Sequence, residues 1–186
     1  MEALPRLTAC ATLVLALAGC SAHHDDAPPV PAGFREHRAD AYAFAYPSGW
    51  TLRPGTEDGG APALDVDGPE LPSGVDDGQI HLGRRDRYTG TLDGQLAQFR
   101  GLALLNGYHL TAVRRTGLDG AGARRVEARY EITSADGTRT PMHLTGLYVL
   151  TGRRTLLEFM IRSPDRGTAA ARVPAILGSF RLEEGR

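Results

Sequence analysis

Both cysteines of this chain lie in its first 20 residues, at Cys10 and Cys20. The rest of the chain therefore has no disulfide to hold a fold together. About 150 residues remain, and a domain of that size buries roughly 68 to 70% of its unfolded surface. We therefore expect the chain to fold around an ordinary apolar core, without help from a disulfide or a metal ion.

The N-terminal segment has the three parts of a secretory signal peptide. Arg6 lies in a short positive head, an apolar run covers residues 7–17, and small residues follow. A transmembrane helix needs roughly 20 apolar residues, and this run ends before the polar segment that begins at Ser21. Residues 1–19 are therefore predicted to be a signal peptide.

The apolar run ends in Leu17-Ala18-Gly19-Cys20, which resembles the lipobox of bacterial lipoproteins. Small side chains suit the cleavage site, and the resemblance implies that Cys20 becomes the first mature residue. Cys20 would then carry a diacylglyceryl group and fatty acyl chains such as palmitate. The predicted location is the extracytoplasmic face of the cell membrane, with a lipid anchor. The alternative is an incidental cysteine at an ordinary cleavage site.

A polar, proline-rich stretch follows Cys20 and cannot bury apolar surface. Residues 20–36 are predicted to be the lipidated cysteine and a flexible tether, and residues 37–186 a single domain. The tether contains adjacent histidine and aspartate pairs at residues 23–26. They form a weak candidate metal site, and a solvated spacer is the simpler interpretation, because a flexible chain does not preorganise ligands.

Composition argues against nucleic acid as a partner, because the formal net charge is -1 and no overall field attracts a polyanion. All 21 basic residues are arginine. With abundant Ala and Gly, this bias indicates a GC-rich genome, and an actinobacterial source is our expectation.

Alternating hydrophobic residues predict most of the strands. Residues 41–46 place Tyr42, Phe44 and Tyr46 on one face, the turn at residues 47–49 ends the strand, and Trp50 returns to the core. Residues 53–78 are predicted to be a long polar excursion with one short strand at 63–66. Further strands are expected at residues 79–83, 108–115, 124–133, 142–151 and 154–162.

Two helices are predicted. The first covers residues 91–106, with Thr91 as N-cap, Asp93 in the first turn and Gly107 at its end. The second covers residues 168–177, with Pro174 bending it. Because the helices are separate from an antiparallel series of strands, the fold class is α+β, with a central antiparallel sheet and flanking helices.

Several segments together resemble the PsbP-like superfamily, and most closely the LpqN-type lipoproteins of actinobacteria. They are residues 44–50 (FAYPSGW), the Asp136-Gly137 hairpin, the Gly152-Arg153 turn and residues 176–181 (ILGSFR). The resemblance covers about residues 35–183 and implies a PsbP-like α/β/α sandwich with a non-enzymatic role in assembling or supporting larger complexes. It supplies no catalytic residues and no cofactor.

No group of residues in the sequence forms a recognisable catalytic constellation. Ser179 lacks the second glycine of a nucleophile elbow, so packing or capping is its expected role. Four histidines lie singly, without metal-ligand spacing, and are expected to be surface or hydrogen-bonded groups: His37, His81, His109 and His143.

Two further patterns leave alternatives open. Asp65, Asp67 and Glu70 form a D-x-D-x-x-E string that could supply oxygen ligands to calcium, although it lacks the pattern of an EF-hand and could simply keep a loop solvated. Four arginine pairs could form an anion-binding patch if the fold gathers them, or could be ordinary charges at strand ends: Arg84-Arg85, Arg114-Arg115, Arg124-Arg125 and Arg153-Arg154.

The sequence supports two functional hypotheses. The first is a lipid-anchored interaction or scaffold module of the cell envelope that binds a protein or envelope component and needs no active site. The second is a carrier or sensor that shelters a small apolar ligand or lipid. A deep apolar pocket would favour the second, whereas a filled core with an exposed charged or apolar patch would favour the first. The sequence does not determine the oligomeric state.

Overall fold

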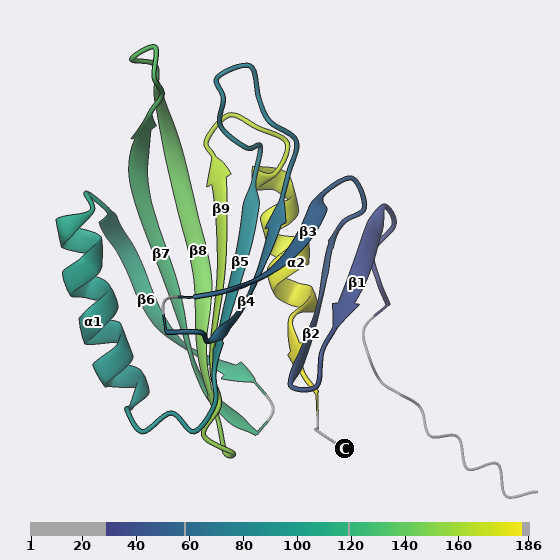
Figure 1. Ribbon diagram of the computed structural model, residues 1–186, viewed down its shortest axis with the longest axis vertical. Coiled ribbons are helices and arrows are strands. Elements are labelled where there is room, and N and C mark those ends of the chain that lie inside the picture. The colour runs from purple at the N-terminus through teal and green to yellow at the C-terminus, as the bar shows by residue number, and fades with distance from the viewer. Residues whose placement is uncertain (1–28, 58, 119, 184–186) are drawn as a thin grey trace, which may run out of the picture.

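The computed structural model describes residues 29–57, 59–118 and 120–183. Its main feature is a large antiparallel sheet of seven strands in the order β3-β4-β5-β9-β8-β7-β6 (Figure 1). These strands are β3 (Thr51–Thr56), β4 (Pro62–Asp67), β5 (Gln79–Arg85), β6 (His109–Leu118), β7 (Ala121–Thr133), β8 (Arg139–Thr151) and β9 (Leu156–Pro164).

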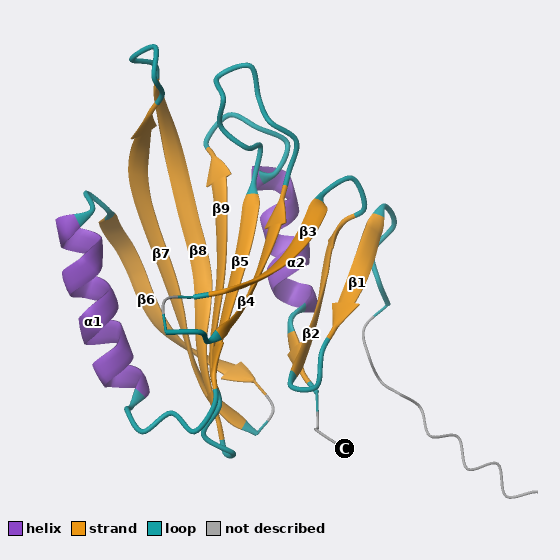
Figure 2. Ribbon diagram, in the orientation of Figure 1, coloured by secondary structure: helices purple, strands orange, loops and turns teal. Residues whose placement is uncertain are grey.

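A second, three-stranded sheet has the order β1-β2-β10. It consists of β1 (Phe34–Arg38), β2 (Tyr42–Pro47) and β10 (Arg181–Leu182). The helix α1 (Leu92–Leu105) packs on one face of the large sheet, and the small sheet lies on the other face with the 3₁₀ turn η1 (Ala170–Arg172) and the helix α2 (Val173–Ser179) (Figure 2). The protein is therefore a sheet-rich α+β fold of three layers.

Alternation along the large sheet produces two separate apolar clusters. One cluster joins α1 to the sheet through residues such as Leu96, Val126 and Leu144. The other joins the small sheet and α2 to the opposite face through Phe44, Phe159 and others. The two clusters together make the large sheet a layer covered on both faces.

The strand β2 has the alternating aromatic residues expected from the sequence, and the alanines between them are buried as well. Phe44 packs against Phe159 with ring centroids 5.0 Å apart, so the aromatic residues face the core. Ala43 and Ala45, between them, are also buried. Since β2 lies between β1 and β10, its alanine face must be covered by side chains from those two neighbours.

Trp50 is a core residue, as predicted, with an exposed fraction of 5%. Two glycines lie against its indole ring. A Cβ atom added to Gly78 would lie 2.5 Å from the ring, and one added to Gly68 would lie 3.2 Å from it. The Gly-rich loop at residues 68–78 therefore closes over the tryptophan.

The helix α1 has the ends predicted from the sequence. The Thr91 hydroxyl accepts a hydrogen bond from the Gly94 N–H at 3.0 Å, as an N-cap residue does. Asp93 lies in the first turn, and Gly107 follows the helix with φ of +72°, a conformation that favours glycine.

The flanking helices are smaller than expected, which corrects the α/β/α description. Only one helix of the described chain, α1, extends beyond seven residues, and the face opposite α1 is covered mainly by the small sheet. The last helix does not run over residues 168–177. Pro174 lies in the first turn of α2, where its missing N–H costs nothing, so it starts the helix instead of bending it.

Three strands lie outside the predicted elements: β1, β3 and the two-residue strand β10. The strand β3 contains Pro54 and Gly55, which hide its pattern; proline is tolerated there because β3 is an edge strand. The strand β1 begins at Phe34 and pairs with β2. The folded domain therefore includes residues before the predicted boundary at residue 37, because β1 completes the small sheet.

Candidate functional site

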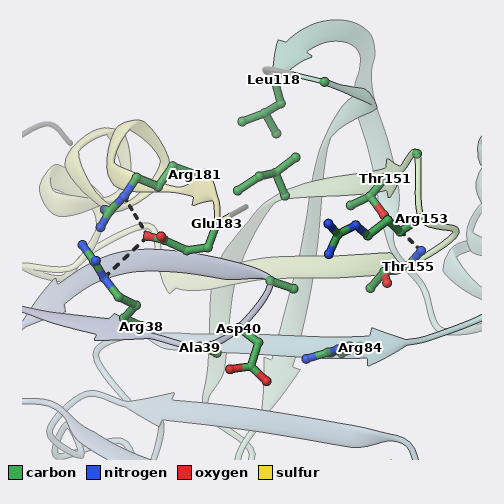
Figure 3. Close-up of a pocket in the computed structure, with 14 residues that line it drawn as sticks. Arg38, Ala39, Asp40, Arg84, Leu118, Thr151, Arg153, Thr155, Arg181 and Glu183 are labelled. Carbon is green, nitrogen blue, oxygen red and sulfur yellow. Dashed lines mark hydrogen bonds and ion pairs between the residues drawn. The ribbon is translucent and has the colours of Figure 1, made fainter. Parts of the chain in front are cut away.

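A wide groove opens where one end of the small sheet meets the large sheet (Figure 3). It has a volume of about 1270 Å³ and is open to solvent. Its lining includes residues 38–41 at the β1–β2 turn, Arg84 of β5, residues 151–153 and Thr155 at the β8–β9 turn, and residues 181–183. Four arginines and two carboxylates face this groove: Arg38, Arg84, Arg153, Arg181, Asp40 and Glu183.

The large-sheet side of the groove is held by a polar contact chain. Arg84 Nε donates to Asp86 Oδ1 at 3.0 Å, and the Thr155 hydroxyl donates to the same carboxylate at 2.9 Å. The hydrogen bond from Arg84 holds the pKa of Asp86 below its usual value. This chain fixes the position of Arg84 beside Arg153 and the β8–β9 turn.

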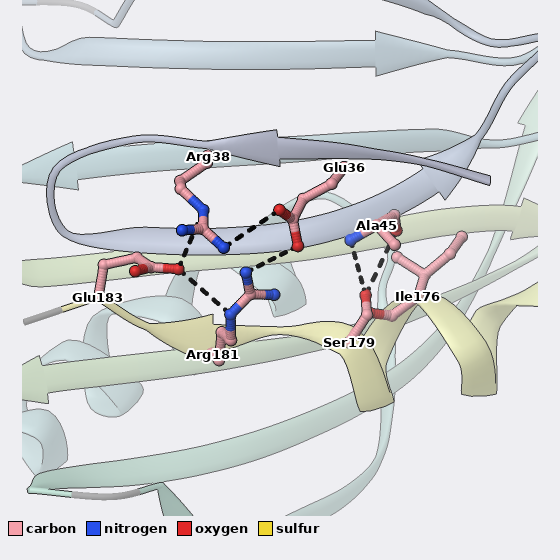
Figure 4. A network of polar contacts seen from close by, with 7 residues as sticks. All are labelled: Glu36, Arg38, Ala45, Ile176, Ser179, Arg181 and Glu183. Atoms are coloured by element: carbon pink, nitrogen blue, oxygen red, sulfur yellow. Dashed lines mark hydrogen bonds and ion pairs between the residues drawn. The ribbon is translucent and has the colours of Figure 1, made fainter. Parts of the chain in front are cut away.

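The small-sheet side carries a closed ring of ion pairs (Figure 4). We call Glu36, Arg38, Arg181 and Glu183 the ion-pair ring. Arg38 lies 3.3 Å from Glu36 and 3.5 Å from Glu183, and Arg181 lies 2.7 Å and 3.2 Å from the same two carboxylates. The ring joins β1 to Arg181 and Glu183 on the other side of β2.

Strand register explains why the ion-pair ring covers the alanines. Arg38 and Arg181 both lie opposite Ala43, and residues directly opposite in a sheet share one face. The short alanine side chains leave room for the two guanidinium groups above β2. The aromatic-alanine alternation of β2 thus supports the core on one face and the ion-pair ring on the other.

A second, smaller hollow lies between α1 and the sheet edge. Its volume is about 270 Å³. We call it the arginine cleft because four arginines and a single carboxylate line it, with Leu96 and Val113: Asp93, Arg100, Arg114, Arg115 and Arg124. Arg124 pairs with Asp93 at 3.1 Å and also donates to the Ala123 carbonyl.

Some members of the four arginine pairs line the groove or the arginine cleft, and the others contact groups within the fold. Neighbouring residues of a strand point to opposite faces, so both members of a pair seldom meet. Arg84 and Arg153 reach the groove, and Arg114, Arg115 and Arg124 reach the arginine cleft. The others are held internally: Arg85 by Glu158, Arg125 by Glu127, and Arg154 by the carbonyls of Tyr88 and Gly90.

A polar network lies beside α1 on the large sheet. Glu158 accepts hydrogen bonds from Arg85 and from the Gln95 amide, the latter at 3.1 Å, and the Tyr88 hydroxyl donates to Gln95. Burial raises the pKa of Glu158, although Arg85 opposes the rise. This network orients the N-terminal half of α1 on the sheet.

The predicted calcium string is divided among different partners. Asp65 lies 2.8 Å from His81, and Asp67 contacts Arg53 and accepts a hydrogen bond from the Gln79 amide at 2.8 Å. Glu70 lies beyond β4, where its backbone forms an isolated antiparallel β-bridge with that of Asp76. Within residues 29–57, 59–118 and 120–183, no group of three or more His, Cys, Asp or Glu side chains is placed to hold a metal ion.

Ser179 and the histidines have local partners. The Ser179 hydroxyl accepts from the Ala45 N–H at 2.8 Å and donates to the Ile176 carbonyl at 2.7 Å, so it caps α2 and continues the edge of β2. His37 packs on Phe44, and burial lowers its pKa. His143 pairs with Asp165, and His109 is exposed.

Cys20 and the histidine and aspartate pairs at residues 23–26 lie outside the described residues. In the part of the chain that the structure describes, no helix is long and apolar enough to span a membrane.

Comparison with known proteins supports the fold. No family model and no curated protein sequence matches the chain. Cyanobacterial PsbP (CyanoP) from Synechocystis superposes with a TM-score of 0.55 at 16% identity, over 82% of this chain and 94% of that one. The PsbP-like fold expected from the sequence is therefore confirmed.

Two further solved structures match this chain with TM-scores below 0.5. The Ran-binding protein Mog1p of Saccharomyces cerevisiae has a TM-score of 0.47 at 12% identity, over 80% of this chain and 95% of that one. LpqN of Mycobacterium tuberculosis, which is involved in cell envelope biogenesis, has a TM-score of 0.41 at 14% identity, over 87% of both chains.

Proposed function

We propose that this protein is a lipid-anchored module of the extracytoplasmic membrane face that binds an envelope protein or envelope component through the arginine-lined groove. The observation that carries the proposal is the groove itself, which is open to solvent and whose described walls carry charged side chains of both signs. Charged walls of this kind favour a partner surface of complementary charge. The lipobox sequence ending at Cys20 supplies the expected anchor.

The groove suits a partner surface better than a small apolar ligand. It is open to solvent and has charged walls, whereas pockets for small ligands are enclosed and mostly apolar. Below it, the aromatic residues of β2 pack directly on the large sheet. These features support the interaction module over the carrier or sensor of an apolar ligand, and the proposed module performs no catalysis.

The anchor is tested by Cys20→Ser. The unaltered protein is expected to partition into the detergent phase, and intact mass should show acylation at Cys20. The Cys20→Ser protein should move to the aqueous phase. Equal partitioning of both proteins into detergent would contradict the lipid anchor.

Partner binding is tested by crosslinking in cells, followed by mass spectrometry of what co-purifies. Arg153→Glu reverses charge in the groove and should remove the specific crosslinked partner. The matched control is Arg139→Glu, since Arg139 has a side-chain exposed fraction of 75% and lies outside the groove. A partner retained equally by both variants would contradict binding through the groove.

A further inference from the structure

The outer side of α1 combines two features that the groove does not explain. The first is the arginine cleft beside β6. The second is a set of exposed leucines in the last turns of the helix, with exposed fractions of 51% at Leu102, 81% at Leu104 and 82% at Leu105. Figure 1 shows α1 at the edge of the molecule, with its outer side uncovered.

The arginine cleft has more positive charge than the surrounding residues neutralise. In the register of β6 and β7, Arg115 lies opposite Arg124 and Arg114 lies opposite Arg125. Like charges placed directly opposite destabilise a sheet. Among the described residues, Asp93 is the one carboxylate that lines the cleft, and it pairs with Arg124. Among the described residues, no ion pair is formed by Arg100, Arg114 or Arg115.

This charge arrangement favours a phosphate-bearing ligand. Arginine binds phosphate oxygens through paired N–H donors, and the guanidinium groups of Arg100 and Arg115, which have no ion-pair partner among the described residues, provide such donors. The cleft volume of about 270 Å³ suits a head group, and is below the size of pockets that enclose whole small molecules, about 300 to 1,000 Å³.

The leucines extend the same surface. Arg100 and Leu104 are four residues apart in α1, so they lie on the same side of the helix. Leu105 continues the apolar surface around the end of the helix. Basic residues next to projecting leucines are typical of helices that lie in a membrane interface, where apolar groups enter the boundary of the acyl chains.

We propose that α1 and the arginine cleft dock on an anionic phospholipid bilayer, with phosphodiester head groups in the cleft and Leu104 and Leu105 in the acyl boundary. The proposal deepens the proposed function, because the lipid anchor would hold the domain at that surface. The 13 residues between Cys20 and Phe34 can span at most about 45 Å. That length allows the domain to turn α1 toward the bilayer.

The test uses the acylated protein reconstituted in vesicles and labelled at Leu105→Cys with an environment-sensitive dye. Acylation of Cys20 and removal of the signal peptide leave this thiol as the only one. Vesicles of phosphatidylcholine alone are compared with vesicles of equal parts phosphatidylcholine and phosphatidylglycerol. We expect a blue shift of the dye only with the anionic vesicles, and its loss in the double variant Arg100→Gln, Arg115→Gln.

Two controls separate docking from unfolding and from general proximity. A dye at Ala135→Cys, in the β7–β8 hairpin, should give the same emission in both vesicles. The melting temperature of the double variant should match that of the unaltered protein, because those arginines form no internal ion pair. Added salt should weaken the shift, since it screens exposed charges.

The outcomes distinguish docking from anchoring. Protein that floats with both vesicles but shows no shift at residue 105 overturns docking and leaves the anchor intact. Protein that floats only with anionic vesicles supports docking and contradicts the anchor, and protein that floats with neither contradicts both. Docking is also overturned if inorganic phosphate alone occupies the cleft without any vesicle-dependent shift, or if the shift requires an envelope protein in the vesicles.

Discussion

Arginine residues form both the ion-pair ring and the arginine cleft, but only in the ring are all of them paired with carboxylates. In the ring, Arg38 and Arg181 each contact both Glu36 and Glu183. In the cleft, Asp93 pairs with Arg124, and Arg100 and Arg115 have no ion-pair partner among the described residues. The comparison teaches that the number of arginines does not identify a binding surface in this protein; the number of carboxylates within reach of them does.

The two regions should therefore respond differently to substitution. Removing one arginine from the ion-pair ring leaves two carboxylates to share the remaining arginine beside a buried strand. Removing one from the cleft relieves repulsion. We expect Trp50→Ala, Arg181→Ala and Arg115→Gln to change the free energy of unfolding by successively smaller amounts.

Trp50→Ala sets the scale for a loss of packing. The ring is buried beneath Gly68 and Gly78, so the free energy of unfolding should fall by about 3 to 5 kcal/mol. Chemical denaturation followed by circular dichroism measures it, because the substitution removes the one tryptophan. Leu105→Ala is the control and should change stability by less than about 0.5 kcal/mol. An unchanged melting temperature in Trp50→Ala would mean that the tryptophan is not a core residue.

Arg181→Ala tests the ion-pair ring. The Arg181 side chain is 18% exposed and has two carboxylate partners, so its loss should lower the free energy of unfolding by about 1 to 2 kcal/mol. The Arg181→Ala, Glu36→Gln double variant should recover part of that loss, because Arg38 then has Glu183 as its single carboxylate partner. If Arg181→Ala has no effect on denaturation, the ring contributes nothing to stability.

Arg115→Gln tests the arginine cleft and should have the smallest effect. Stability should stay within about 0.5 kcal/mol of the unaltered protein, with any change toward greater stability, because a like-charge pair opposite Arg124 is removed. Denaturation under the same conditions measures it. A loss comparable to that of Arg181→Ala would show that the cleft arginines are structural and would remove the contrast between the two regions.

Local rules predicted the elements with strong patterns. The cap at Thr91 and the glycine at residue 107 set the ends of α1, and alternation identified β2 and the strands from β6 to β9 closely. The burial of Trp50 followed from its place after the turn at residues 47–49. These features depend on neighbours in sequence, so one sequence was sufficient to find them.

Contacts between distant residues were not predictable in the same way. The ion-pair ring joins residues 36 and 38 to residues 181 and 183, and no local pattern links them. The alanines at positions 43 and 45 were the available signal, since small buried residues in a strand leave space for side chains from its neighbours. The strand β3 was missed because Pro54 and Gly55 obscure a pattern that an edge position tolerates.

The small sheet is built from both ends of the described domain, since β1 and β2 come from its beginning and β10 from its end. The layer over one face of the large sheet therefore cannot be completed until residues 181 and 182 have been synthesised. Until then, the aromatic face of β2 is only partly covered in a newly made chain. Deletions at either terminus should open this same layer, which makes the two ends of the domain a single folding unit.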